Sequence, residues 1–242
     1  MHNKLKTSLN NKFLQIFSIN ILFKTSTIII ILIAISSCSS MKPSEQKTTI
    51  TKTHQELNKT TTNEQIILTV EEGSSANYKV KEQLGNLDLP SYAIGKTKSL
   101  TGNIVFNKDG NIANNSLLEL ALKTLKSDKS RRDQYLRKNS LQSNIFPKAT
   151  FKPQKLEGLP WPLPKSGKYS GKLSGIMSLH GETKPLTWII TVEFIDSTVI
   201  GTATTSFLFS DFEIQKPRVA IVLSVEDNIT LEINLLGRIN TP

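Results

Sequence analysis

The sequence predicts an all-β protein built from short antiparallel strands, and three observations support this fold class. From residue 66 onward, short runs alternate apolar and polar side chains, which is the signature of half-buried strands. Turn residues separate these runs at short intervals, and strands joined by short turns run antiparallel. Almost no segment shows the 3.6-residue periodicity of a helix. Roughly ten such strands over residues 66–242 are enough for one barrel or sandwich, so one domain is expected.

The first clear hairpin is expected between residues 101 and 123. Residues 101–106 place Gly102, Ile104 and Phe106 on one face, and the sequence Asn-Lys-Asp-Gly at 107–110 then supplies turn residues. Residues 117–123 form the partner strand, with three leucines on one face: Leu118, Leu120 and Leu122.

The C-terminal half shows the strongest alternation. Strands are expected at 171–180 and 187–194, joined by a turn at 181–185, and at 199–209. Two further strands are expected at 219–225 and 229–235, joined by a turn at 226–228. Glycines at 175 and 201 are expected where the backbone bends or another chain segment comes close. With few helices available, the apolar face must be covered by a second sheet or by closure into a barrel.

One segment departs from the strand pattern. Ser130 and Asp133 have the spacing of a capping box, in which Ser130 is the N-cap. A short helix is expected near residues 131–139, with Tyr135 and Leu136 turned inward, lying across one end of the barrel.

The first 37 residues have the pattern of an export signal. Four lysines are the only charged residues before position 38, an apolar run occupies 28–35, and small residues lead to Cys38. The sequence Ile-Ser-Ser-Cys at 35–38 resembles a bacterial lipobox, which implies an acylated Cys38 at the mature N-terminus. The alternative is an uncleaved anchor at 13–35, but Lys24 interrupts it, and the ~20 residues that span a bilayer are not reached after that lysine. Either interpretation places the protein in the cell envelope, facing the periplasm or the cell exterior.

Residues 38–65 are expected to form a flexible tether, because they contain too few apolar side chains to offset the entropy of ordering. The predicted organisation is therefore 1–37 signal peptide, 38–65 tether and 66–242 barrel domain. The formal charge of +10 falls to +6 when the four lysines of the signal are removed, that is 26 basic minus 20 acidic residues. In that compartment we expect a lipid partner and no nucleic acid.

The sequence offers little for catalysis. One Cys and three His residues exclude a disulfide framework and a metal site of several cysteines. His54 falls in the tether, and His180 ends a strand with no evident Ser or Cys partner, while Glu182 nearby is better explained as turn chemistry. We therefore expect no enzyme, no catalytic residue and no metal; a hydrolase using His180 is the least favoured hypothesis.

Four short motifs occur in order along the second half of the chain. They are Arg132-Asp133 with Leu136, Phe146-Pro147 with Phe151, Leu179-His-Gly181 with Lys184-Pro185, and Asp211-Phe212 with Ile214 and Pro217. As a set they resemble the YceI-like family of polyisoprenoid-binding proteins. The resemblance implies a lipocalin-like antiparallel β-barrel that encloses a long isoprenoid chain, in a protein that is exported or lipid-anchored. The family's opening His-Ser pair is missing here, where Tyr78-Lys-Val80 and Tyr92-Ala-Ile94 stand instead.

Eleven side chains are expected to face the barrel interior and form a ligand-binding wall: Phe106, Leu120, Leu136, Phe146, Phe151, Leu173, Met177, Leu179, Trp188, Ile190 and Phe207. Periodicity alone does not separate such a wall from a packed core, whereas the resemblance implies the wall. Two basic residues of the expected helix, Arg131 and Arg132, are candidates for a headgroup contact, against the alternative of a solvated face. Trp161 either closes the barrel rim or packs within its loop.

These observations favour an envelope lipoprotein, anchored to the membrane, that binds a polyisoprenoid or isoprenoid quinone inside the barrel and needs no other cofactor. The alternative is a non-enzymatic structural or interaction module with a packed barrel core. A homodimer is left open.

Overall fold

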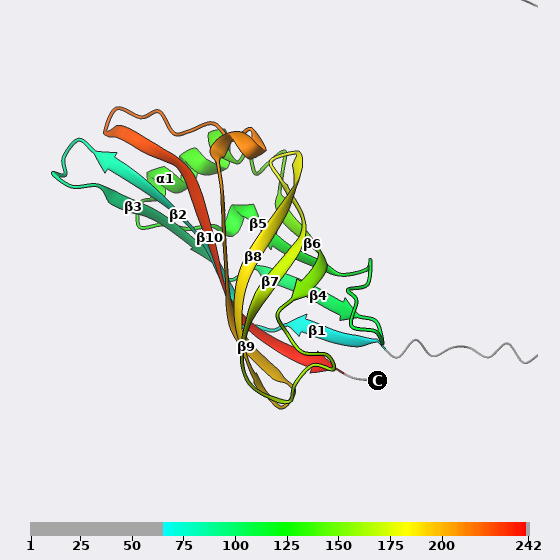
Figure 1. Cartoon of the computed structure of the whole chain (residues 1–242). Helices are drawn as coiled ribbons and strands as arrows, with labels where there is room; N and C mark the ends of the chain where they lie inside the picture. The colour runs from blue at the N-terminus through cyan, green and yellow to red at the C-terminus, as the bar shows by residue number, and fades with distance from the viewer. Residues whose placement is uncertain (1–64, 241–242) are drawn as a thin grey trace, which may run out of the picture. The chain divides into compact units, whose positions relative to one another are not determined.

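Ten strands lie within residues 65–240, the part of the chain that the computed structural model describes (Figure 1). The first five are β1 (Ile66–Val70), β2 (Ser75–Leu84), β3 (Ser91–Thr97), β4 (Leu100–Phe106) and β5 (Leu117–Ala121). The others are β6 (Lys148–Glu157), β7 (Ser166–Leu179), β8 (Glu182–Ile195), β9 (Thr198–Phe207) and β10 (Val222–Asn240). The helical segments are η1 (Leu122–Thr124), α1 (Ser130–Tyr135), the π-helical turn η2 (Leu136–Ser140) and η3 (Phe209–Phe212). The predicted signal, Cys38 and the tether up to residue 64 lie outside the described residues.

The sheet closes into a barrel with eight antiparallel positions around its circumference. We call each position a stave, whether one strand or two strands in line occupy it. Strands pair in the order β1-β4-β5-β6-β7-β8-β9-β10, and β10 pairs back to β1. Along the same edge of β10, Thr69 of β1 pairs with Arg238 and Ala76 of β2 pairs with Ile233, so β1 and β2 form one interrupted stave. β3 and β4 form the adjacent stave in the same way, because β3 pairs with β2 and β4 with β1. The predicted fold class, an antiparallel barrel with one short helix, is confirmed.

The longest hairpin joins β7 to β8 and has a tighter turn than predicted. The two strands pair without a register shift from Leu179 with Glu182 to Ser166 with Ile195. His180 and Gly181 form the whole turn, with φ of 55° and 88°. Two residues with positive φ match the right-handed twist of the flanking strands. The predicted turn at 181–185 is therefore wrong, since its last four residues already belong to β8.

The two predicted strands at 219–225 and 229–235 are instead parts of one strand, β10. Their predicted turn at 226–228 is a bulge, because Val225 pairs with Glu82 and Ile229 already pairs with Val80 of β2. Lys81 on β2 forms an ion pair with Glu226 in the bulge at 2.8 Å. A bulge admits extra residues without ending the pairing, so polar residues at this position do not imply a chain reversal.

The expected helix near 131–139 is present, but only its first part is α-helical and its N-cap differs. α1 ends at Tyr135 and continues as the π-helical η2. Lys129 occupies the N-cap position, and no side chain caps the helix, so the prediction of Ser130 as N-cap is wrong. Ser127 instead donates its backbone N–H (2.9 Å) and its hydroxyl (2.6 Å) to Oδ1 of Asp133, because the chain folds back before the helix.

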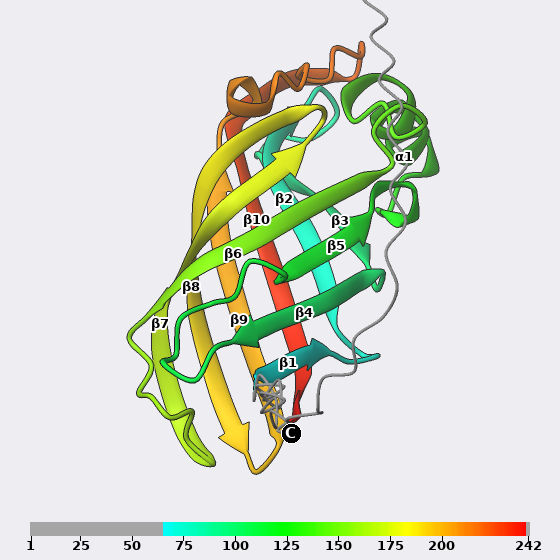
Figure 2. The same ribbon diagram turned by 90° about the vertical axis from the view of Figure 1, so that its right-hand side faces the viewer.

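Figure 2 shows α1 at one end of the barrel and β1 near the other. We refer to the first as the α1 end. No helix within residues 65–240 has both the length and the apolar character needed to cross a membrane.

Phe212 in η3 is the most completely buried large side chain, at 0% exposure. Its ring lies 4.7 Å from that of Phe207 in an edge-to-face arrangement. We expect Phe212→Ala to lower the free energy of unfolding by about 3–5 kcal/mol, because it removes buried apolar surface and leaves a cavity. Leu208→Ala, at a neighbouring side chain that is 44% exposed, serves as the control in urea unfolding. Equal losses for the two variants would show that η3 does not depend on this packing.

Candidate functional site

The barrel interior holds a cavity of about 220 Å³. Every strand except β3 contributes to its lining, and the α1 end adds residues of η1, η2 and η3. The exposed surface of the wall is almost wholly apolar, made by Leu, Ile, Val, Ala, Met, Phe and Trp side chains. An eight-stranded barrel is wide enough to be filled by its own side chains or to hold one small ligand, and here space remains.

Ten of the eleven predicted wall residues line this cavity: Phe106, Leu120, Leu136, Phe151, Leu173, Met177, Leu179, Trp188, Ile190 and Phe207. They come from β4 to β9 and from η2, and the closure of the sheet brings them together. Their role toward a ligand stays a prediction.

Phe146 does not line the cavity. It lies in the loop between η2 and β6, where its ring packs edge-on against His180 with centroids 5.0 Å apart. A Cβ at Gly181 would lie 2.9 Å from the Phe146 ring, so the ring covers the β7–β8 turn. The alternation of a strand places its side chains on a known face, whereas a loop residue such as Phe146 has no such constraint.

The sequence prediction missed the wall contributed by β2 and β10. Tyr78 and Val80 of β2 and Leu231 and Ile233 of β10 line the cavity. The signal was present as period-two alternation in both segments. The assignment to the interior was missing. For β2 the reason is that the first strands depart from the family pattern.

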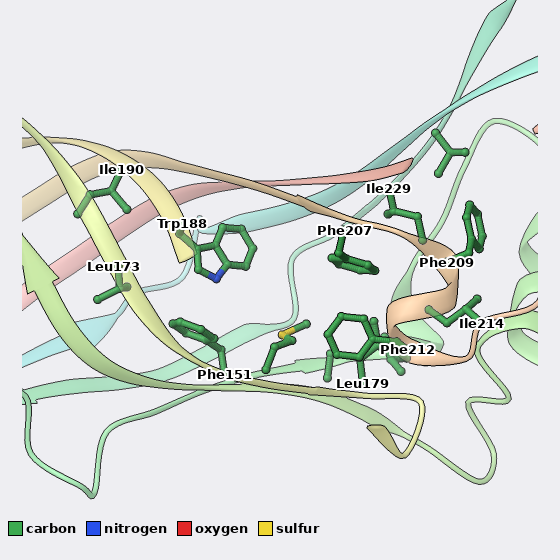
Figure 3. Close-up of a cluster of buried hydrophobic side chains, with 14 of the residues drawn as sticks. Phe151, Leu173, Leu179, Trp188, Ile190, Phe207, Phe209, Phe212, Ile214 and Ile229 are labelled. Carbon is green, nitrogen blue, oxygen red and sulfur yellow. The ribbon is translucent and has the colours of Figure 1, made fainter. Parts of the chain in front are cut away.

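Several aromatic side chains pack against one another in the barrel interior (Figure 3). Phe151 and Trp188 meet edge to face, with ring centroids 6.1 Å apart and planes at 72°. Phe209 and Ile214 lie at the α1 end of the same cluster, beside Phe212. Such contacts hold the rings in defined positions along the wall.

Arg132 is held by acidic side chains at the α1 end. Its Nη2 lies 2.6 Å from Oε1 of Glu82 on β2, and its Nη1 contacts Asp128. The Arg132 side chain is 17% exposed and that of Glu82 is 7% exposed. Neither Arg131 nor Arg132 lines the cavity, and Arg131 is exposed on α1. The charge of Arg132 is thus already compensated by protein carboxylates. This argues against the headgroup contact predicted for Arg132.

We expect Arg132→Met to lower the free energy of unfolding by about 3 kcal/mol, because it leaves the buried Glu82 carboxylate without a counter-charge. Adding Glu82→Met should restore part of the loss, since no buried charge is then left alone. Lys155→Met, which breaks an exposed ion pair with Glu157 at 2.8 Å, is the control and should not shift the urea midpoint measurably. A shift of equal size in the control would contradict this.

His180 and Trp161 both have structural partners. Nδ1 of His180 lies 3.1 Å from the backbone oxygen of Phe212, which ties the β7–β8 turn to η3. Nε1 of Trp161 donates to the backbone oxygen of Lys108 at 3.0 Å, and its ring lies 5.7 Å from that of Phe106. Trp161 therefore packs within the loops at its end of the barrel. Between residues 65 and 240, no three His, Cys, Asp or Glu side chains group in a way that would hold a metal ion.

Comparison with known proteins agrees with this architecture. The model of the YceI-like domain family matches residues 68–236. No curated protein matches the chain. A polyisoprenoid binding domain from Saccharophagus degradans, implicated in plant cell wall breakdown, is similar in structure with a TM-score of 0.57 and 11% identity, over 72% of this chain and 98% of that one.

BcnA of Burkholderia cenocepacia is similar with a TM-score of 0.50 and 16% identity, over 69% of this chain and 98% of its own. A YceI protein of Campylobacter jejuni matches with 17% identity and a TM-score of 0.47, over 66% of this chain and 90% of its own. At these identities the similarities to the S. degradans domain and to BcnA show a shared fold.

Proposed function

Because the chain belongs to the YceI-like domain family, we propose that its barrel binds one long apolar lipid, of the polyisoprenoid or isoprenoid quinone type. We further propose that the protein carries this lipid in the cell envelope, held there by an acylated Cys38. The observation that carries the proposal is the continuous apolar cavity inside the closed barrel.

The cavity favours binding over a purely structural role. Native cores are packed to the density of organic crystals and contain few voids larger than one water, which occupies ~30 Å³ in the liquid. A cavity of about 220 Å³ is far larger. Because the cavity wall offers almost no polar surface, water that fills the cavity makes few hydrogen bonds. An apolar ligand, by contrast, lowers its free energy when it leaves water for this cavity. A structural module would gain stability by filling this space with its own side chains.

The size of the cavity also indicates how a long lipid would be held. Ligand pockets usually measure ~300–1,000 Å³, so this cavity accommodates only part of a long chain as it stands. Met177 lies on the wall and is buried. Methionine side chains adapt easily to irregular space, and movement of Met177 would extend the cavity along the barrel. We therefore expect the loaded barrel to be slightly wider than the one described.

The family fold and the cavity support lipid binding; the envelope location is supported by the sequence pattern before Cys38. A tether of the predicted length reaches at most about 100 Å when fully extended, at ~3.3–3.6 Å per residue. That reach would let the barrel turn either end toward the membrane that holds the anchor.

We expect Cys38→Ser to move the protein from the membrane fraction to the soluble fraction of the envelope. The thiol is the proposed acylation site, and the acyl chains supply ~0.8 kcal/mol of membrane affinity per buried CH₂. Cell fractionation with detection of the C-terminal domain measures the change, with Ser37→Ala as the matched control. Membrane retention of the Cys38→Ser variant would support the uncleaved anchor at 13–35.

The ligand proposal is tested on residues 65–242. The matches to the S. degradans domain and to BcnA cover 98% of those two chains. We therefore expect residues 65–242 to fold without the segment that precedes them. The domain is exported in a bacterial host and analysed by native mass spectrometry and lipid extraction. We expect one isoprenoid lipid per barrel. Repeated recovery of protein alone, with no uptake of isoprenoid quinones from micelles, would contradict the proposal and favour the structural module.

A further inference from the structure

Two hydroxyl groups at the α1 end are buried without a hydrogen-bond partner among the described residues. They are the phenol of Tyr78 on β2 and Oγ of Ser140 in η2. Ser140 is 0% exposed, and both residues line the cavity. Buried hydroxyls are normally paired, so two that share one end of an apolar cavity require an explanation.

Both groups belong to the same end of the barrel. Tyr78 shares the inward face of β2 with Glu82, and its phenol feels the charges of Arg132, Asp133, Glu82 and Asp128 around α1. The ring lies over Gly95 on β3, where a Cβ would come within 2.2 Å of it, so the ring is fixed in place. Ser140 ends the π-helical turn that continues α1. Burial raises the pKa of Tyr78 above its ordinary value, so its hydroxyl stays protonated and able to donate at neutral pH.

The charges around these hydroxyls are unsuited to an anionic group. The charges that act on the Tyr78 phenol are one cation, Arg132, and the carboxylates of Glu82, Asp128 and Asp133. Arg132 pairs with Glu82 and Asp128, Lys129 also pairs with Asp128, and Arg137 of η2 donates to the backbone oxygen of Leu125. No Lys or Arg is among the residues that line the cavity. A phosphate or carboxylate brought to this end of the cavity would lose its hydration and would find no Lys or Arg on the wall to compensate its charge.

The other two buried polar atoms without a hydrogen-bond partner lie elsewhere. Trp188 sits midway along the wall, with Phe151 edge to face beside its indole ring (Figure 3). His180 Nε2 is outside the cavity lining. Tyr78 and Ser140 are therefore the two hydroxyls that the α1 end offers to a ligand.

We propose that the hydroxyls of Tyr78 and Ser140 hydrogen-bond an uncharged oxygen on the ligand's head, such as an alcohol or a quinone carbonyl, and that the cavity selects neutral over anionic isoprenoid lipids. This inference rests on the proposed function, because it assigns the head of the lipid whose chain fills the cavity. It places that head at the α1 end and the chain toward β1.

The test compares four probes with one isoprenoid tail on the domain of residues 65–242. They are geranylgeraniol, menaquinone-4, geranylgeranyl diphosphate and the hydrocarbon analogue without oxygen. Affinities are measured by displacement of N-phenyl-1-naphthylamine. We expect the alcohol and the quinone to bind at least ten-fold more tightly than the hydrocarbon and the diphosphate.

The double variant Tyr78→Phe with Ser140→Ala should lose this preference, so that the alcohol and quinone bind like the hydrocarbon. Its affinity for the hydrocarbon should change less than two-fold, which also shows that the barrel is folded. Tyr169→Phe with Ser170→Ala removes the same two atoms from β7, at residues that do not line the cavity, and should leave the preference intact.

Equal binding of the alcohol and the hydrocarbon, or tighter binding of the diphosphate, would overturn the inference while leaving the proposed function in place. A preference that survives in the Tyr78 and Ser140 double variant would overturn the assignment of these two residues. Failure of all four probes to bind would overturn the proposed function itself, and the inference with it.

Discussion

Ala203→Trp should strongly weaken lipid binding by the barrel. Ala203 lines the cavity from β9, where it is paired with Ile190 of β8 and Ile233 of β10. An indole at this position would occupy much of the roughly 220 Å³ that the lipid needs. We expect the affinity for an isoprenoid to fall by a factor on the order of 100, equivalent to ~2.7 kcal/mol of binding free energy.

The variant should still fold, because overpacking usually costs ~1–3 kcal/mol and this cavity offers room. Thr204→Trp is the matched control, since Thr204 is exposed on the outer face of the same strand. Displacement of a fluorescent apolar probe measures both variants. Normal uptake by Ala203→Trp would show that the lipid is bound somewhere other than this cavity.

Gly175→Ala should destabilise the barrel by at least ~3 kcal/mol, which is at the upper end for a point substitution. A Cβ at Gly175 would lie 2.2 Å from the carbonyl oxygen of Lys152 and 2.8 Å from Cα of Pro153. These are backbone atoms at the bulge of β6, where the pairing shifts between Pro153 and Lys155, so they cannot move without breaking the β6–β7 register.

Gly85→Ala is the control for this effect. The nearest atom to a Cβ there is Cδ2 of Leu223 at 3.6 Å, and a glycine in a permissive conformation often gains ~0.4–1 kcal/mol on replacement by alanine. Urea unfolding of the two variants measures the difference. Equal stability of both would contradict the close approach of β6 and β7.

The strand faces were predictable where alternation is regular and both neighbours in the sheet are near in sequence. Leu173 and Met177 on β7 and Trp188 on β8 all point inward as expected. The expectation of a close backbone approach at Gly175 and Gly201 also agrees with the structure. The family resemblance rested on motifs in this same region, and the family model confirms it over residues 68–236.

The interruptions within strands were not predictable from local sequence. Gly73 and Ser74 interrupt β1 and β2, yet both strands pair with the same edge of β10. There Ser74 Oγ donates to the backbone oxygen of Leu236 and accepts from its N–H, both at 2.9 Å. The bulge in β10 likewise lies opposite β2, where Lys81 pairs with Glu226. Each outcome is decided by a partner more than a hundred residues away.

The α1 end was the least predictable part of the candidate site. Arg132 looked like a headgroup ligand because local sequence shows only its charge. Its partner Glu82 lies fifty residues earlier, and only the closed barrel brings the two together. For the same reason the sequence did not single out Tyr78 and Ser140, whose common feature is a buried hydroxyl without a partner.

Lipid binding is tested most directly by a crystal structure of residues 65–242 purified from a bacterial envelope without added lipid. We expect one continuous tube of density beyond the protein, running along the wall past Trp188 and Met177, with its polar end beside Tyr78. An interior filled by repacked side chains, or by ordered water alone, would contradict the claim that this barrel binds a lipid.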